Sequence, residues 1–297
     1  MTGLTVCDTG KDYSTFGHAV ILLLIQLGGL GITTLSTALF LLFGQRASLS
    51  ARDVVEGSFL ARPTGRLKTL LAQIFVWTMA IEVIGAVMLL PAALRHRPMT
   101  EAVWSAVFHS VSAFCNAGFS LHSDNLMSAR SNTAVILPIA GLIILGGLGF
   151  SVITEITDTF WDRIRGRRAT RLSLHSKTAL TTTGVLLLVG TVAFWILESG
   201  NLHRGTNLMC RLLTSFFASV TPRTAGFNSI DYGQATTATV FLTMVLMAIG
   251  GCPGSTAGGI KATTLAVLFA AARARLRGSR WVTLFGRGIP DMAVDKA

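Results

Sequence analysis

The chain has 297 residues, of which 51% are hydrophobic and only 13% are charged, and its mean hydropathy is +0.60. This composition is too apolar for a typical water-soluble domain, so it predicts an integral membrane protein whose first partner is the lipid bilayer. The net charge of +11 does not indicate binding to nucleic acid, because the basic residues gather beside apolar stretches rather than on one face interleaved with aromatic residues.

Five apolar stretches are long enough to cross about 30 Å of hydrocarbon as helices. In chain order they lie between Asp12 and Arg46 and over residues 69–94, 131–154, 178–197 and 232–260. Residues 1–17 lack a basic segment followed by a short apolar core, so we predict no cleavable signal and expect the first stretch to direct insertion. The second stretch contains one acid, Glu82, which we expect to face the interior of the helix bundle.

Two shorter segments, residues 102–119 and 206–227, are less suited to crossing, and Arg211 interrupts the second of them. If both enter and leave on one side of the membrane, the basic segments at 44–68, at 157–177 and from Arg273 onward all fall on the same side. Full crossing would place the first two basic segments on opposite sides. Because basic residues favour the cytoplasmic side, the charge pattern predicts re-entrant loops and a cytoplasmic C-terminus.

A repeated pair of glycine marks divides the chain into similar units. The first mark is a glycine next to an apolar residue in a short segment, and the second is a glycine doublet in the apolar stretch that follows. The marked glycines are Gly3, Gly118 and Gly226, and the doublets begin at Gly28, Gly146 and Gly250. We interpret each full unit as an outer helix, a half-length pore helix, an extended glycine loop and an inner helix, which predicts an all-α membrane fold. The doublets are also typical of close helix packing.

The glycine loops predict a cation-binding backbone. Non-helical backbone at membrane depth is tolerated only where it is buried in protein or lines a water-filled path, and its carbonyl oxygens can replace the hydration shell of a cation. A central glycine permits positive φ, so that consecutive carbonyls point the same way, and it adds no side chain that would narrow the ring. The candidate ion-binding residues are Thr2, Gly3, Leu4, Asn116, Ala117, Gly118, Phe119, Thr224, Ala225, Gly226 and Phe227.

The third inner stretch is broken by glycine, proline and small hydroxyl residues, where a continuous helix is not expected. We name residues 250–261 the interrupting loop and expect it to act as a gate below the glycine loops, near the middle of the membrane. Its candidate gating residues are Gly250, Gly251, Pro253, Gly254, Ser255, Thr256, Ala257, Gly258, Gly259 and Lys261. A phosphate-binding loop is not predicted, because Ile260 separates the last glycine from Lys261. Lys261 is either a gating residue or a structural, snorkelling one.

These motifs together resemble the Trk/Ktr/HKT superfamily of potassium transporters. The resemblance rests on residues 2–6, 114–119, 221–228 and 250–261, and it extends from Met1 to about Arg280. It implies a potassium-channel-like pore of four pseudo-equivalent units in the plasma membrane, with an intramembrane gate in the broken third inner helix. Glycine in every loop is associated with potassium in this family, so the resemblance implies K⁺ as the transported ion, and no covalently bound cofactor is expected.

The resemblance also implies a homodimer and a separate cytoplasmic ring protein that binds nucleotides. The basic segment from Arg273 to Arg277 is a candidate contact for that ring, with anionic lipid as the alternative. The chain contains about two and a half of the four expected units, so we interpret it as truncated. The predicted parts are a first repeat without its outer and pore helices (1–68), a second repeat (69–156), a third repeat (157–280) and a cytoplasmic tail (281–297).

Two other classes of protein are open alternatives. An intramembrane enzyme needs a nucleophile or a metal site with an acid or base in the same cavity. His109, Glu82 and Glu155 lie on separate predicted elements, no HExxH or GxSxG motif occurs, and the four cysteines have no metal-binding spacing, so we do not expect an enzyme. The second alternative is a non-conducting assembly subunit. The sequence does not distinguish channel-like transport from transport coupled to sodium or protons.

Overall fold

The structure is a computed structural model that describes residues 8–29, 67–95, 97–167, 172–202, 205–279 and 281–288. The first glycine loop, with Thr2, Gly3 and Leu4, lies outside these residues, as do Cys7 and most of the predicted tail. Within the described ranges the regular structure is helical except for one antiparallel hairpin of Thr283–Leu284 (β1) and Arg287–Gly288 (β2). The predicted all-α class is confirmed.

The helices follow the predicted order of outer helix, short helix, loop and inner helix, which occurs twice in the described part of the chain. The first unit contributes α1 (Thr15–Gly29); the second contributes α4 (Leu67–Ala93), α5 (Met99–Phe114), α6 (Thr133–Leu148) and α7 (Phe150–Ile164); the third contributes α8 (Leu174–Glu198), α9 (Leu208–Val220), α10 (Thr237–Ala248) and α11 (Ala262–Leu276). The short helices α5 and α9 match the two segments that were predicted to be too short to cross.

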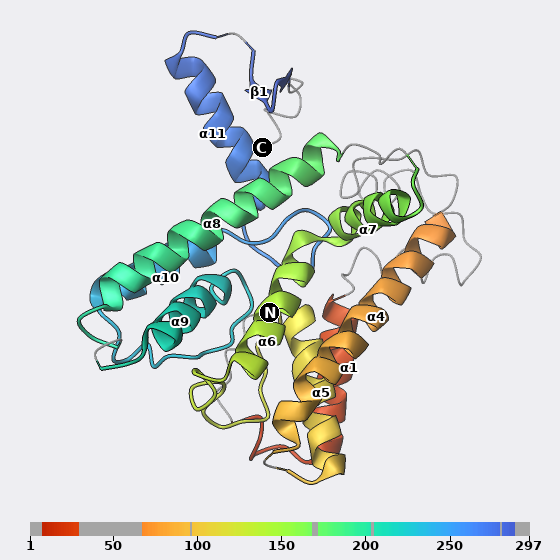
Figure 1. The fold of residues 1–297 in the computed structure, drawn as a ribbon, viewed down its shortest axis with the longest axis vertical. Helices are drawn as coiled ribbons and strands as arrows, with labels where there is room; N and C mark the ends of the chain where they lie inside the picture. The colour runs from red at the N-terminus through yellow and green to blue at the C-terminus, as the bar shows by residue number, and fades with distance from the viewer. Residues whose placement is uncertain are drawn as a thin grey trace.

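Helix α6 lies between two groups of helices (Figure 1). On one side α5 packs against α1, α4 and α6, and on the other α9 packs against α8 and α6. A single cluster of buried apolar residues joins the two sides and includes Phe114, Ile139, Phe217 and Phe227. Phe114 ends the first short helix and Phe227 lies just after Gly226. The core of the molecule therefore lies where the glycine loops leave their short helices.

Among the residues that the structure describes, two helices are long and apolar enough to cross a membrane, within α4 (Ala72–Ala93) and as α8 (Leu174–Glu198). The count rises to three if α6 and α7 are taken as one bent span. Large apolar side chains are exposed on the outside of these helices, including Val76 and Val87 on α4 and Leu188 on α8. Such surface suits contact with lipid chains rather than with water.

The expectation of one continuous helix over residues 131–154 is wrong. The helix ends at Leu148, and α7 leaves it at an angle of 104°. The residue between them, Gly149, has φ of 89°, and a Cβ at this position would lie 2.8 Å from the carbonyl oxygen of Pro253. The interrupting loop of the third unit therefore lies directly against the bend.

Candidate functional site

The second glycine loop begins where α5 ends in a Schellman motif. The amide of Ala117 donates to the carbonyl of Ser112 at 2.8 Å, and the amide of Asn116 donates to that of Ala113 at 3.1 Å. This motif requires a left-handed residue after the helix cap, which glycine and asparagine supply most readily. Asn116 has φ of 52° and Gly118 has φ of 78°, so left-handed residues alternate along the loop. Alternation of this kind lets consecutive carbonyls face one side.

The third glycine loop repeats this pattern with different residues. Thr224 has φ of 67° and Gly226 has φ of 81°, at the positions that match Asn116 and Gly118. A β-branched residue is uncommon in this region of backbone conformation and is found mainly where the surrounding structure enforces it. Here the amide of Gly226 donates to the carbonyl of Thr221 at 3.3 Å, which closes the turn after α9.

The two loops meet at their central glycines. A Cβ built on Gly118 would clash with the carbonyl oxygen of Ala225 and would lie 2.9 Å from the Cα of Gly226. Asn116, Ala117, Ala225 and Phe227 are almost fully buried. The structure thus brings together the predicted residues of the second and third loops, although those of the first loop lie outside the described residues.

Two of the predicted ion-binding carbonyls are engaged by side chains. The hydroxyl of Ser112 donates to the carbonyl of Phe119 at 2.8 Å, and the hydroxyl of Thr221 donates to that of Phe227. Both hydroxyls come from the end of the short helix that precedes the loop. These two hydrogen bonds hold each glycine loop against the helix that precedes it. The carbonyls of Phe119 and Phe227 therefore fix the position of their loops, a role that sequence reasoning did not identify.

The interrupting loop is closed at its base by backbone hydrogen bonds. The amide of Gly250 donates to the carbonyl of Ile260 at 2.9 Å, and the amide of Ala262 donates to that of Gly251 at 3.0 Å. Lys261 Nζ donates to the carbonyl of Ala257 at 2.9 Å. Of the two roles considered for Lys261, this contact supports the structural one.

The interrupting loop docks in the break between α6 and α7. The last carbonyls of a helix and the first amides of the next one have no partner within their helices. Here the amides of Cys252 and Thr256 donate to the carbonyls of Gly147 and Gly146 at 2.9 and 3.1 Å, and the amide of Phe150 donates to the carbonyl of Gly254 at 3.2 Å. The interrupting loop therefore supplies hydrogen-bond partners for the last carbonyls of α6 and for the first amide of α7. The glycine doublet Gly146-Gly147 thus binds the interrupting loop as well as allowing close packing.

One side chain of the interrupting loop reaches the second glycine loop. Asn116 Nδ2 donates to Thr256 Oγ1 at 2.7 Å, and the same hydroxyl donates to the carbonyl of Phe114 at 3.0 Å. Several other polar atoms here are buried without a hydrogen-bond partner among the described residues, namely Asn116 Oδ1, Thr224 Oγ1, Arg223 Nε and Ser255 Oγ. Buried polar atoms are normally satisfied, and these four come from the two glycine loops, the interrupting loop and the guanidinium of Arg223 beside them.

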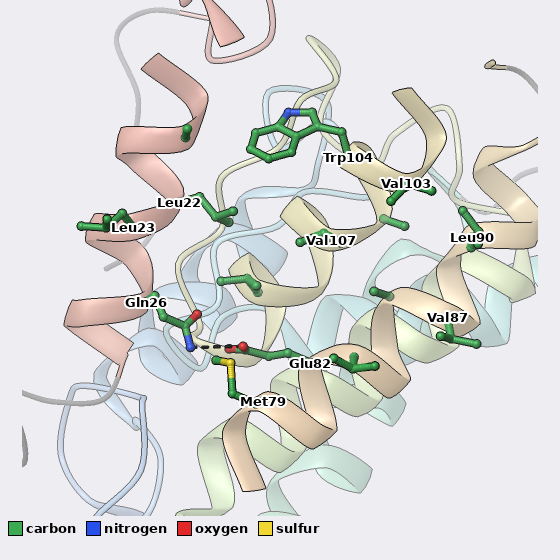
Figure 2. A pocket seen from close by; sticks show the side chains of 15 residues that line it. Leu22, Leu23, Gln26, Met79, Glu82, Val87, Leu90, Val103, Trp104 and Val107 are labelled. Carbon is green, nitrogen blue, oxygen red and sulfur yellow. Dashed lines mark hydrogen bonds between the residues drawn. The ribbon is translucent and has the colours of Figure 1, made fainter. Parts of the chain in front are cut away.

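Glu82 lies behind the second glycine loop, where it connects three elements. Its carboxylate accepts from Gln26 Nε2 on α1 at 3.1 Å and from Cys115 Sγ at 3.6 Å, and Figure 2 shows the first of these contacts. The expectation that Glu82 faces the bundle interior is confirmed, since it is 5% exposed. It borders a pocket of about 660 Å³ between α1, α4 and α5, whose lining is otherwise almost entirely apolar, with Trp104 near the other end (Figure 2).

A histidine pair is formed by His109 on α5 and His122 in the loop between α5 and α6. His109 is buried, with Nδ1 placed 2.7 Å from the carbonyl of Ser105 and Nε2 placed 3.0 Å from Ser120 Oγ. Its ring stacks on His122 at a centroid distance of 5.0 Å, and Arg97 donates to His122 Nδ1 at 3.2 Å. Burial lowers the pKa of His122, and the adjacent Arg97 lowers that pKa further. His109 is held on both sides by structural contacts, which gives no support to a catalytic role.

No group of three His, Cys, Asp or Glu side chains is arranged to hold a metal ion among the residues with a described position. The site at the centre of the molecule is instead made of backbone carbonyls, amide groups and hydroxyls. Oxygen-rich groups of this kind suit a weakly held alkali cation better than a transition metal, which favours sulfur and nitrogen ligands.

Comparison with known proteins agrees with this chemistry. The family model described as TrkH, cation transport protein, matches residues 1–285. The chain belongs to the TrkH family. Relatives in this family include the potassium/sodium uptake protein NtpJ of Enterococcus hirae, 39% identical, and the Ktr system potassium uptake protein B of Bacillus subtilis, 38% identical, both matched over 100% of this chain. The chain covers 64% and 66% of their respective lengths.

A solved structure supports the membrane fold of this TrkH-family chain. The potassium transporter TrkH from Vibrio parahaemolyticus superposes with a TM-score of 0.69 at 19% sequence identity, over 99% of this chain and 58% of that one. At this level of identity the likeness concerns the fold. The chain is therefore a multi-pass membrane protein with a transporter fold, as the sequence motifs predicted.

Proposed function

We propose that this chain forms part of a pore that carries potassium ions across the membrane. The observation that supports this most is the meeting of two glycine loops, each with alternate left-handed residues, at the buried centre of the molecule. Backbone of this geometry presents carbonyl oxygens that replace the water around an alkali cation. The ion-binding residues proposed in these two loops are Asn116, Ala117, Gly118, Thr224, Ala225 and Gly226. The proposed ion-binding residues of the first glycine loop are Thr2, Gly3 and Leu4.

Potassium is the proposed ion because each loop has a glycine at its centre, as the family resemblance implies. The names of both relatives include potassium uptake, and that of NtpJ also includes sodium. Selectivity therefore needs a direct test, with rubidium as the tracer for potassium and with sodium as the competitor.

The interrupting loop is the proposed gate. It is tied to helix ends and to a glycine loop by single hydrogen bonds, each of which contributes about 1 kcal/mol. The free energy needed to break these few hydrogen bonds is small enough to come from the binding of a partner protein, so the loop can leave its position when a partner binds. The proposed partners are a second copy of the chain and a cytoplasmic nucleotide-binding ring, with the basic end of α11 as the contact at the cytoplasmic face of the plasma membrane.

An enzymatic function has no support in the described residues. The pocket beside Glu82 offers one carboxyl group, whose two oxygens accept from Gln26 and Cys115, and the buried Cys115 thiol does not line the pocket. The proposed role of this region is to hold the second glycine loop.

The experiment that tests the proposal is rubidium uptake by cells that lack their own potassium uptake systems. The chain is expressed alone and, in parallel, within the complete reading frame found in its genome. We expect growth at low potassium and rubidium uptake from the complete frame, with sodium a poor competitor. Normal membrane expression without uptake from either form would overturn the proposal and favour a non-conducting assembly subunit.

A further inference from the structure

Asn116 and Thr256 join two segments that lie 140 residues apart in the chain. Both residues are buried, Asn116 completely. The hydroxyl of Thr256 accepts from Asn116 Nδ2 and donates to the carbonyl of Phe114, while the amide of Thr256 donates to the carbonyl of Gly146. One residue of the interrupting loop is thus bonded to the second glycine loop, to the end of its short helix and to α6.

The hydrogen bond of the Asn116 side chain is made from a particular backbone conformation of the second glycine loop. The Asn116 amide group reaches Thr256 from a backbone with φ in the left-handed region, at 52°, two residues before Gly118. Thr224 holds the matching position in the third loop, and the Cβ direction of Gly258 points to its methyl group at 4.0 Å. The interrupting loop therefore bonds to the second glycine loop at Asn116 and passes near the equivalent residue of the third loop.

We infer that Thr256 couples the position of the interrupting loop to the ion occupancy of the second glycine loop. This inference rests on the proposed function, in which the glycine loops bind potassium and the interrupting loop is the gate. If the interrupting loop moves away, Asn116 Nδ2 and the Phe114 carbonyl lose a partner in a buried place, which disfavours the move. A cation that fixes the glycine loop in its present conformation also favours the docked loop, because such coupling is reciprocal.

Thr256 is a positioning residue in this scheme, because it acts through Asn116 and the Phe114 carbonyl. A purely structural bond would change stability equally with and without potassium. A coupling bond changes how strongly potassium affects the interrupting loop, and this difference is the quantity to measure.

Cys252 is a suitable reporter, because it lies in the interrupting loop and is completely buried while the loop is docked. Its amide donates to the carbonyl of Gly147 at 2.9 Å, so labelling of its thiol requires the loop to leave the break between α6 and α7. The rate at which a water-soluble thiol reagent labels Cys252 is measured on the complete purified protein in lipid nanodiscs, in potassium and in choline. Cys252→Ser gives the background of the other native cysteines.

The test compares variants that keep or remove the bond. Thr256→Ser keeps the hydroxyl, and Thr256→Val removes it at nearly the same volume. Asn116→Gly removes the donor and suits the positive φ, so it tests the same bond if Thr256→Val does not fold. Ser151→Ala on α7 is the matched control, since it removes a buried hydroxyl that has no hydrogen-bond partner among the described residues and belongs to neither loop.

We expect potassium to slow labelling by about five-fold in the parent, the effect of about one hydrogen bond. Thr256→Ser and Ser151→Ala should keep this protection, whereas Thr256→Val and Asn116→Gly should lose most of it, with no further loss when they are combined. Full protection in Thr256→Val, or no protection in the parent, would overturn the coupling. Protection that depends on Thr256 in a protein without rubidium uptake would refute transport and leave the coupling standing.

Discussion

Gly118 lies directly against the backbone of Ala225, with no room for a side chain between the second and third glycine loops. A Cβ on Gly118 would lie 2.9 Å from two atoms of Gly226 and still closer to the carbonyl oxygen of Ala225. Each loop therefore limits the position of the other. A change in one glycine moves the carbonyls of both loops, which makes this contact the most sensitive point of the proposed ion path.

Replacing Gly118 with serine should reduce the preference for potassium over sodium. The new side chain clashes with the third loop, and a φ of 78° costs a non-glycine residue about 1–3 kcal/mol. We expect the ratio of rubidium to sodium uptake to fall by roughly ten-fold, and Gly226→Ser to act in the same direction. The control is Gly141→Ser on α6, where a Cβ meets nothing within 4 Å. An unchanged uptake ratio in both loop variants would contradict the carbonyl path.

Deleting residues 254–258 should raise the rubidium flux, because the deletion removes the centre of the proposed gate. The same deletion removes the acceptor of the Phe150 amide and the donor to the Gly146 carbonyl, so we also expect a lower melting temperature. Both quantities are measured on protein with verified membrane expression. A flux that falls to zero at normal expression would show that the interrupting loop is scaffolding rather than a gate.

Local sequence features predicted several elements of this molecule correctly. The segment interrupted by Arg211 forms the short helix α9, as its length predicted, and the cluster of glycine and proline from Gly250 marked the interruption between α10 and α11. Glycine at 118 and 226 indicated positive φ, which the structure confirms. These features could be predicted because their causes, backbone freedom and the cost of a charge in lipid, act within a few residues.

Contacts between distant segments could not be predicted from the sequence. The break at Gly149 depends on hydrogen bonds from residues about a hundred positions later, and the similar Gly-Gly-Leu-Gly run at Gly28 offered no way to tell a break from close packing. The contacts of Glu82 with Gln26 and Cys115 likewise join three elements. Asn116 carried a usable signal, because asparagine directly after a helix commonly takes the left-handed conformation.

Glu82 should stabilise the second glycine loop through its two acceptor oxygens. Glu82→Ala leaves the Gln26 amide and the Cys115 thiol without that acceptor in a buried place, and we expect it to lower the free energy of unfolding by about 2 kcal/mol. Glu82→Gln keeps an acceptor oxygen and should lose less than half as much. The measurement is unfolding in detergent, with the exposed Glu101→Ala as control. Equal losses in Glu82→Ala and Glu101→Ala would contradict this role.

The loop that contains His122 should lose stability as the pH falls. Burial and the nearby Arg97 lower the pKa of His122, while Asp124 opposes them. Because the folded state binds the proton less readily than the unfolded chain, the stabilisation is fully present above the ordinary histidine pKa of about 6.5 and is lost as the pH falls through that value. We expect the melting temperature to drop between about pH 7.5 and pH 5.5.

His122→Asn should reduce that drop, because the asparagine oxygen can accept from Arg97 at the former Nδ1 position and does not titrate. Arg97→Gln should also reduce the drop, since it removes the positive charge that opposes protonation of His122. The melting temperatures of the parent and both variants are compared at the two pH values. If His122→Asn shows the same drop as the parent, the acid sensitivity arises from another group, and the contact between Arg97 and His122 has no part in it.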